Sequence, residues 1–530
     1  MTKAATIDRG WAVGLLLAAL VLYWINLGKL PLRDWDEATV AQVAREIWRS
    51  PSDALTWLHP TIAGVPYFNK PPLIHWLIAL CYRVGGVNEW TTRLPGATLT
   101  ALSVPLLYGI GRELFARKTP AIFAALIYLT LLPVARHGRL AMLDGAVLCF
   151  FLLLIFCLLR TRRDLRWGLG VGLACGLLGM TKGIIVIPLA TIALIFTVLD
   201  TPRLLSSGYV WLGVLIGSFP LLVWYVAQWR FYGQTFIRIS LFNQSLDRTW
   251  QPVENNQGAP WYYLLEILKY SLPWLLFWPQ GFRLAWDTRY LSWAKLVFVW
   301  VIGFLLVISV MSTKLPWYVL PVYPALALVG GMQLTQVWNP RDLYGIHKPD
   351  LKFPGFWWIS LGLIAIAGWG GCAYFSLLGP DPKPELAIVL AALSLTTSAA
   401  TVLAARHDAQ FIPLLIWGMY VSLILFMASN YWIWELGESY PVKPVAAIVQ
   451  HRVPPQQPVF TSYPYARPSL NFYSDRQVIP QSASELQRHW REDSQPYLLV
   501  EPATLTQLNL PGVKLLGKTP NWLVITKNSK

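Results

Sequence analysis

The chain has 530 residues, 55% of them in the hydrophobic set, and a mean hydropathy of +0.46. This composition leaves too little polar surface for a soluble globular protein, so that class is excluded. The formal net charge of +16 would suggest a nucleic-acid partner in a soluble protein, but the Lys and Arg residues lie largely in short loops between apolar runs. We therefore relate the charge to membrane topology and lipid phosphates, and expect no nucleic-acid partner.

Uncharged apolar runs recur from residue 11 to residue 434. A bilayer core of about 30 Å needs roughly 20 apolar residues per helix, so these runs predict an all-α polytopic membrane bundle. The first run, Trp11 to Leu27, lacks a small-residue cleavage site and is expected to be a retained helix. The thirteen candidate spans are 11–30, 95–113, 119–136, 143–160, 167–181, 183–199, 209–229, 261–281, 292–311, 316–335, 356–378, 386–405 and 411–430.

Basic residues in short loops indicate the orientation of the bundle, because such loops favour the cytoplasmic side. A cytoplasmic N-terminus places nearly all of the basic loops inside: 111–120, 160–167, 200–203, 282–290, 339–348 and 405–408. The outer side then receives 31–94, the stretch before Asp144, the turn at Lys182, the loop 230–260 and the C-terminal region. Segment 71–87 is apolar enough to span, but a span there would reverse every later loop. We interpret it as a helix lying on the outer surface.

From about residue 435 the chain becomes polar, and β-rich runs such as 458–463 and 497–501 alternate with a helical stretch at 482–490. This pattern predicts a small soluble α/β domain at 435–530, after a transmembrane domain at 1–434. Outer juxtamembrane helices are expected within 31–94 and 230–260. The five cysteines all lie in apolar stretches without a CxxC pair, so neither a disulfide framework nor a thiolate metal site is expected.

Acidic residues stand at two points of the expected outer face. Asp36 and Glu37 follow the first span at the start of a helix, where the helix dipole favours carboxylates. They are either ordinary helix-start acids or a general base or metal ligand. Asp144 stands at the mouth of a span, where an acid is costly unless it is paired or functional.

Basic residues stand at the same face. Lys70 lies between aromatic residues and two prolines, and is either solvated or a phosphate contact. Lys182 and Lys314 are lone cations between apolar spans, and snorkelling could explain each one alone. Arg248 could bind a phosphate oxygen or simply decorate a loop. Together with the acids, these residues predict one site at the non-cytoplasmic surface.

Six stretches carry a family resemblance: Asp36-Glu37 after the first helix, YFNKPPL, RLAMLDG, MTKG, KLPWYVLPVYPALAL and, near the C-terminus, SLNFYSDRQV. They resemble the membrane glycosyltransferases of the GT-C type, and within that type the aminoarabinose transferase and protein O-mannosyltransferase relatives. The resemblance extends over essentially the whole chain.

The resemblance implies a role for each residue. Asp36 matches a catalytic aspartate and Asp144 a second acid. The remaining matches are Lys70 beside the donor phosphate, Lys182 and Arg248 as holders of the carrier phosphate, and Lys314 and Tyr318 within a conspicuous family segment. Asn69 stands where the aminoarabinose branch has Glu, and a His is usual there near Asn243. Both are metal-ligand types in that branch, so a bound zinc or other divalent ion is in doubt here.

The expected function is transfer of a sugar from a polyprenyl phosphate carrier of the undecaprenyl type to an outer-face acceptor, in the plasma (inner) membrane. Lipid A, another glycolipid, a polysaccharide or a protein could be the acceptor. Inversion with Asp36 as base is expected. A lipid-linked sugar transporter or flippase also needs charges in the membrane, but places them near its middle and often shows internal repeats. A scaffold with a sensor tail would leave Asp36, Asp144 and Lys182 unexplained.

Overall fold

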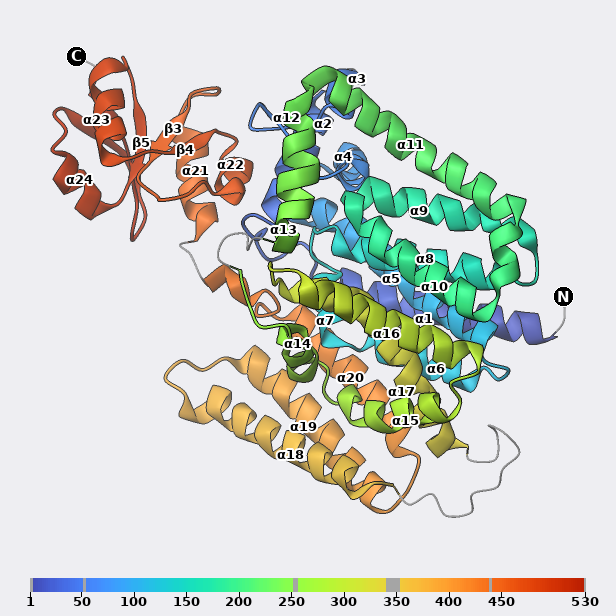
Figure 1. Ribbon diagram of the computed structural model, residues 1–530. Coiled ribbons are helices and arrows are strands. Elements are labelled where there is room, and N and C mark those ends of the chain that lie inside the picture. Colours follow the sequence, from blue (N-terminus) through green and yellow to red (C-terminus); the bar gives the residue numbers. More distant parts are fainter. Residues whose placement is uncertain (1–2, 51–53, 251–255, 340–352, 438–440, 529–530) are drawn as a thin grey trace. The chain divides into compact units, whose positions relative to one another are not determined.

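A computed structural model of the chain describes residues 3–50, 54–250, 256–339, 353–437 and 441–528. The chain divides into two compact units (Figure 1). The helical unit consists of Met1–Leu27, Phe68–Ile74 and Arg93–Trp432. The sheet unit consists of Gly28–Tyr67, His75–Thr92 and Ile433–Lys530.

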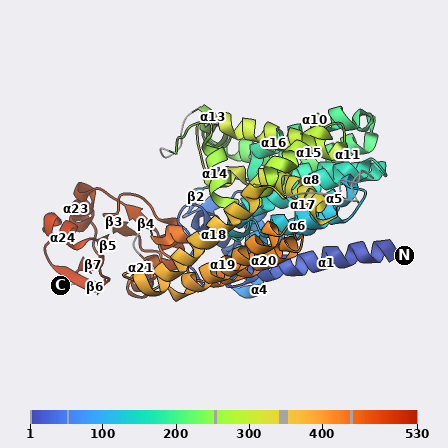
Figure 2. The same ribbon diagram turned by 90° about the horizontal axis from the view of Figure 1, so that it is seen from below.

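Apolar helices make up nearly all of the helical unit. Its main elements are α1 (Lys3–Trp24), α5 (Glu89–Leu114), α6 (Thr119–Leu129), α7 (Leu132–His137), α8 (Asp144–Thr161), α9 (Gly168–Lys182), α10 (Val186–Asp200), α11 (Gly208–Tyr232), α12 (Gln234–Ile237), η4 (Arg238–Leu246), α13 (Asp247–Trp250), α14 (Tyr262–Tyr270), η5 (Trp274–Phe277), α15 (Trp278–Asp287), α16 (Ser292–Val310), η6 (Pro316–Val322), α17 (Tyr323–Trp338), α18 (Gly355–Ala373), α19 (Pro384–Ala405) and α20 (Phe411–Ala428). In both views α18 and α19 lie side by side (Figure 2). Within the described residues, ten helical stretches are long and apolar enough to cross a membrane. The expected membrane bundle is therefore present, and the count of thirteen spans stays a prediction.

Two expected spans are not continuous helices. The stretch 119–136 divides into α6 and α7, with Leu131 in an extended conformation two residues before Pro133. The stretch 261–281 divides into α14, η5 and the start of α15, around Pro273. Proline has no backbone N–H and disfavours a helical residue before it, so apolar composition alone did not reveal these breaks.

Helices α9 and α11 pack closely through glycine faces. A Cβ placed on Gly172 would lie 1.7 Å from the carbonyl carbon of Gly213, and one on Gly176 would lie 1.8 Å from the carbonyl oxygen of Gly217. The matched positions rise together along both helices, so the two helices are parallel. Helix α10 follows α9 in the chain and runs back in the opposite direction after Gly183, whose φ of +60° suits glycine.

We expect Gly176→Leu to separate α9 from α11, because the backbone of Gly217 occupies the space that the new side chain needs. The cost should reach or exceed the upper end of about 1–3 kcal/mol for overpacking a core. Thermal unfolding of the detergent-solubilised protein measures this. Gly14→Leu is the matched control, because no atom lies within 4 Å of a Cβ at Gly14. Equal melting temperatures for the two variants would contradict the close packing.

Ion pairs gather the expected basic loops at one end of the helical unit, called the basic end below. Glu113 pairs with Arg160 and Arg163, and Asp200 pairs with Arg162 and Lys295. Because α8 ends at the basic end and α9 starts from it, Asp144, the first residue of α8, and Lys182, the last residue of α9, both lie at the opposite end. The loops 160–167 and 200–203 thus lie at the same end, and their cytoplasmic location stays a prediction.

The sheet unit is built on five strands in the order β4-β3-β5-β7-β6. They are β3 (Val459–Thr461), β4 (Val478–Pro480), β5 (Tyr497–Val500), β6 (Val513–Lys518) and β7 (Leu523–Lys527). Strand β3 is parallel to β4 and β5, whereas β7 is antiparallel to β5 and β6. Helices α21 (Val442–Arg452), α22 (Pro468–Ser474), α23 (Ala483–Glu492) and α24 (Pro502–Leu508) accompany the strands. The unit also takes in residues before 93, and the domain boundary at residue 435 stays a prediction.

The N-terminal part of the sheet unit contains α2 (Glu37–Arg49), α3 (Ala54–Leu58) and the hairpin β1 (Thr61–Ile62) and β2 (Val65–Pro66). Helix α4 (Leu73–Gly85) has 13 residues, a length of about 20 Å at 1.5 Å per residue. A helix of that length is too short for a bilayer core of about 30 Å. The interpretation of 71–87 as a surface helix stays a prediction.

Candidate functional site

Asp144 and Lys182 form an ion pair in the helical unit. Lys182 Nζ donates to Asp144 Oδ1 at 2.7 Å, and both side chains are largely buried. Asp144 is the first residue of α8 and Lys182 the last residue of α9. A carboxylate at a helix N-terminus and a cation at a C-terminus are both stabilised by the helix dipole. The sequence thus places each charge where its own helix favours it, and the antiparallel packing of the helices brings the charges together.

Tyr318 completes this cluster from a third segment. The ammonium of Lys182 lies 5.5 Å from the centroid of the Tyr318 ring, within the range of a cation–π contact. Tyr318 lies in η6, directly after the expected Lys314 turn. The structure therefore brings Asp144, Lys182 and Tyr318 together, and their role as one site stays a prediction.

Lys314 has local partners instead. Its buried ammonium donates to the carbonyl oxygens of Ile308 at 3.2 Å and Ser309 at 2.7 Å, near the end of α16. It also lies 5.4 Å from the ring centroid of Tyr263, and burial lowers the pKa of the Lys314 amine. These contacts explain Lys314 as a cap of α16.

The loop that carries Asn69 and Lys70 lies against the Lys182 turn. Pro71 Cδ is 3.8 Å from the position that a Cβ on Gly183 would occupy. On the other side of the loop, the ring of Phe68 packs edge-on against Tyr232 at 4.8 Å between centroids. Lys70 and Asn69 are both half-buried. Lys70, a second cation, is therefore the chain neighbour of Pro71, which lies against the Lys182 turn.

Three buried arginines surround Trp432 in the helical unit, a cluster that the sequence did not predict. Arg136 Nε donates to the carbonyl oxygen of Trp432 at 2.9 Å. The guanidinium carbons of Arg93 and Arg139 lie 5.3 and 4.3 Å from the Trp432 ring centroid. The only signal for this cluster was the density of Arg residues in 136–139, just before an apolar run.

We expect Arg139→Met to destabilise the helical unit. Its guanidinium donates to the carbonyl oxygens of Ile25 and Met427, and the substitution would leave both acceptors unsatisfied in a buried place. A loss of about 1–3 kcal/mol follows, seen as a lower melting temperature in detergent. Arg289→Met, at an exposed position of the basic end, serves as the control and should change stability by less than about 0.5 kcal/mol.

Asp36 and Glu37 differ sharply in exposure, although they are neighbours at the start of α2 in the sheet unit. The side chain of Asp36 is 26% exposed and pairs with Arg33 at 3.2 Å. Glu37 is fully buried, and its Oε2 accepts the backbone N–H of Arg33 at 3.0 Å. Only Asp36 can therefore reach a reacting group, whereas Glu37 fixes the turn that precedes α2.

The turn before Asp36 is tied to the C-terminal part of the sheet unit. Arg467 Nε donates to Asp34 Oδ2 at 2.7 Å, and Arg33 also lies 3.7 Å from Glu435. The stretch SLNFYSDRQV was noticed in the sequence as a family feature, but nothing there indicated that its neighbour Arg467 binds Asp34. Arg33, Asp34, Glu435 and Arg467 are the residues of this site that the sequence missed.

Two predicted residues lie in the segment after α11. Arg248 belongs to α13, and its side chain is outside the described part of the structure. Asn243 lies exposed on η4. Among the described residues, no three His, Cys, Asp or Glu side chains are grouped to hold a metal ion. Asn69 and Asn243 offer amide oxygens where the aminoarabinose branch has Glu and His, so this donor set is a poor match for zinc.

Comparison with known proteins gives the site its context. Residues 69–226, which contain Lys70, Asp144 and Lys182, match the family model of dolichyl-phosphate-mannose-protein mannosyltransferases. The chain is 31% identical over 348 residues to undecaprenyl phosphate-α-4-amino-4-deoxy-L-arabinose arabinosyl transferase 1 of Pseudomonas fluorescens Pf-5, covering 62% of this chain and 60% of that relative. It is 30% identical over 412 residues to arabinosyl transferase 2 of P. fluorescens Pf0-1, covering 73% of this chain and 70% of that relative.

A solved structure shares the fold over nearly the full length. The crystal structure of ArnT from Cupriavidus metallidurans bound to undecaprenyl phosphate superposes with a TM-score of 0.78 at 19% sequence identity, over 98% of each chain. At this identity the likeness shows the fold. The apo structure of the same enzyme gives a TM-score of 0.77.

Proposed function

We propose that this chain, which belongs to the family of undecaprenyl phosphate-α-4-amino-4-deoxy-L-arabinose arabinosyl transferases, transfers a sugar from a polyprenyl phosphate carrier to an acceptor at the outer face of the membrane. The observation that carries the proposal is the Asp144–Lys182 ion pair with Tyr318 beside it, within a segment that matches a family of lipid-phosphate-sugar transferases. The relatives' names point to aminoarabinose on undecaprenyl phosphate as donor, and a glycolipid such as lipid A is our first choice of acceptor.

The proposed reaction is a displacement at the anomeric carbon. A bond forms between an acceptor oxygen and that carbon, and the bond from the carbon to the carrier phosphate breaks. Negative charge gathers on the departing phosphate, where Lys182, Lys70 and Arg248 stabilise it electrostatically. A lysine ammonium has three N–H donors, so Lys182 can keep its bond to Asp144 and still bind a phosphate oxygen. Asp144 thus orients Lys182.

Asp36 is the proposed general base, because its carboxylate is partly exposed and held by Arg33. It takes the proton from the acceptor hydroxyl as the new bond forms. With one carboxylate as base, the configuration at the anomeric carbon inverts. We assign Glu37 to the support of the turn, since its buried carboxylate is bonded to backbone.

We also propose thirteen membrane crossings, with the basic end in the cytoplasm and the sheet unit outside the plasma membrane. Helices α9 and α10 are two crossings. Because α9 and α11 are parallel, α10, which lies between them in the chain, has to cross the membrane back. The broken pairs α6–α7 and α14–α15 complete two further crossings. The ion-paired arginines at the basic end support the orientation, since short basic loops favour the cytoplasm.

Transfer to a protein is the second candidate, favoured by the family model that matches residues 69–226. A flippase is disfavoured, because Asp144 and Lys182 lie at helix ends and not midway along a span.

One experiment separates these functions. Purified protein is incubated in detergent with undecaprenyl phosphate-aminoarabinose and either lipid A or a peptide acceptor, and the products are read by mass spectrometry. We expect a mass increase of one aminoarabinose on lipid A. Modified peptide would move the assignment to protein transfer, and movement of donor across vesicles without any product would overturn the transferase proposal.

A further inference from the structure

The segment Arg33–Glu37 carries Asp36 on a strained turn. The backbone N–H of Asp36 donates to the carbonyl oxygen of Asp34 at 2.7 Å, which closes a three-residue turn. Its central residue, Trp35, has a φ of +64°. This is the γ-turn that is rare for residues with a side chain. A bulky residue keeps such a conformation only where its surroundings hold it, and strain of this kind gathers at functional sites.

Residues of the C-terminal segment hold the turn on one side of Trp35. Asp34 Oδ2 accepts from Arg467 Nε at 2.7 Å, while Asp34 Oδ1 accepts from the backbone N–H of Ser469 at 3.2 Å and from its hydroxyl. Arg467 and Ser469 are both buried. The Arg467 guanidinium also lies 5.5 Å from the ring centroid of Tyr463. The Asp34 carboxylate is therefore bound by residues from beyond position 460.

The chain is also held on the near side of the turn. The backbone N–H of Leu32 donates to Tyr473 Oη at 2.8 Å. Arg33 lies between the carboxylates of Asp36, at 3.2 Å, and Glu435, at 3.7 Å. The turn is thus fixed at Leu32, Arg33 and Asp34 by the same unit, and the direction of the Asp36 carboxylate follows from these anchors.

We infer that Arg467 and Ser469 are positioning residues for Asp36: by binding Asp34 they hold the strained turn that aims the Asp36 carboxylate. The C-terminal segment thereby contributes to the chemical step without touching the reacting atoms. This inference rests on the proposed function, in which Asp36 is the base. An arginine suits the task because a charged hydrogen bond to a carboxylate is short and directional.

Arg467→Ala tests the inference through kcat and KM measured separately. We expect kcat per folded protein to fall about 10- to 100-fold, because a base displaced by about 1 Å loses that much. The KM for undecaprenyl phosphate-aminoarabinose should change less than about twofold, since Arg467 does not bind the donor. Arg467→Lys keeps the charge and should restore part of kcat.

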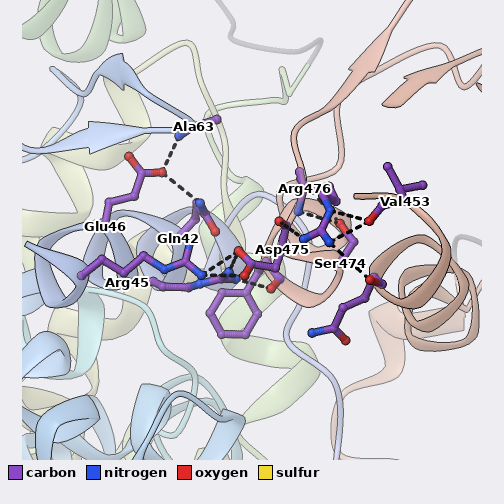
Figure 3. Close-up of polar contacts among 11 residues, drawn as sticks. Gln42, Arg45, Glu46, Ala63, Val453, Ser474, Asp475 and Arg476 are labelled. Atoms are coloured by element: carbon purple, nitrogen blue, oxygen red, sulfur yellow. Dashed lines mark hydrogen bonds and ion pairs between the residues drawn. The ribbon is translucent and has the colours of Figure 1, made fainter. Parts of the chain in front are cut away.

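The matched control is Arg49→Ala. Arg45 binds Asp475 (Figure 3), and Arg49 binds the same carboxylate, so both connect α2 to α22. Their side-chain hydrogen bonds go to Phe472 and Asp475 and not to residues 33–37. Loss of this ion pair should lower the melting temperature and leave kcat within about twofold. If Arg49→Ala reduced kcat as much as Arg467→Ala, general loosening of the unit would explain both, and the inference would be wrong.

A second variant depends on the strain itself. Glycine adopts positive φ freely, so Trp35→Gly relieves the turn, and Arg467→Ala should cost a smaller fold-change in kcat in that background. The double variant Asp34→Ala, Arg467→Ala should lower kcat no more than either single change does.

Full kcat in folded Arg467→Ala overturns the positioning role. Should that variant not fold, Arg467→Lys and Asp34→Asn decide, and parent kcat in both overturns it as well. Activity in Asp36→Asn would instead overturn the proposed base.

Discussion

Asp36→Asn is expected to reduce sugar transfer by about 10²- to 10⁴-fold, the range lost when a positioned general base is removed. The amide has nearly the shape of the carboxylate but cannot take a proton at working pH. Asp36 is partly exposed and pairs with Arg33, so the change should leave the turn and α2 folded. The initial rate of product formation by purified protein, with lipid A as acceptor, measures the effect.

Two further measurements make this test specific. Asp36→Asn should bind undecaprenyl phosphate as the parent does, seen as an equal rise in melting temperature on adding the lipid. Asp408→Asn removes a carboxylate in the turn before α20, where Asn can still accept the backbone N–H of Gln410, and should keep the parent rate. If Asp36→Asn transferred sugar as fast as Asp408→Asn, another group would have to be the base.

The cost of isolated charge near hydrocarbon is the reason why the sequence singled out Asp144 and Lys182 as site candidates. Neither residue is stable there without a partner or a role, and the structure pairs them at 2.7 Å. The same reasoning did not distinguish Lys314, which binds carbonyl oxygens of the preceding helix, from Lys182, which pairs with an acid. A lysine after a helix can donate to the last carbonyls of that helix, and sequence does not show whether it turns back to them.

The partner of Asp34 could not be predicted, because Arg467 is 433 residues away in the chain. Hydrophobic periodicity and helix caps describe only local structure, and without a known contact the docking of α22 near the first turn has no sequence signal. The positive φ of Trp35 is equally hidden, since a tryptophan has no preference for it. The bundle was predictable from composition, whereas the supports of Asp36 arise only from tertiary packing.

Lys182→Met is expected to lower both stability and transfer, for two separable reasons. It removes a cation that stabilises the departing phosphate, which should cost about 10²- to 10³-fold in kcat. It also leaves the Asp144 carboxylate unpaired in a largely buried position, where breaking a pair costs roughly 3–5 kcal/mol. Lys182→Arg keeps the charge and should retain part of both properties.

The double variant Asp144→Asn, Lys182→Met separates the two effects. Neutralising Asp144 removes the unpaired charge, so the melting temperature should recover toward that of the parent, while transfer stays low because the Lys182 cation is still missing from the phosphate site. Undecaprenyl phosphate should also raise the melting temperature of this variant less than it raises that of the parent. Recovery of transfer together with stability would show that Lys182 serves only to pair Asp144, and the phosphate role would then pass to Lys70 or Arg248.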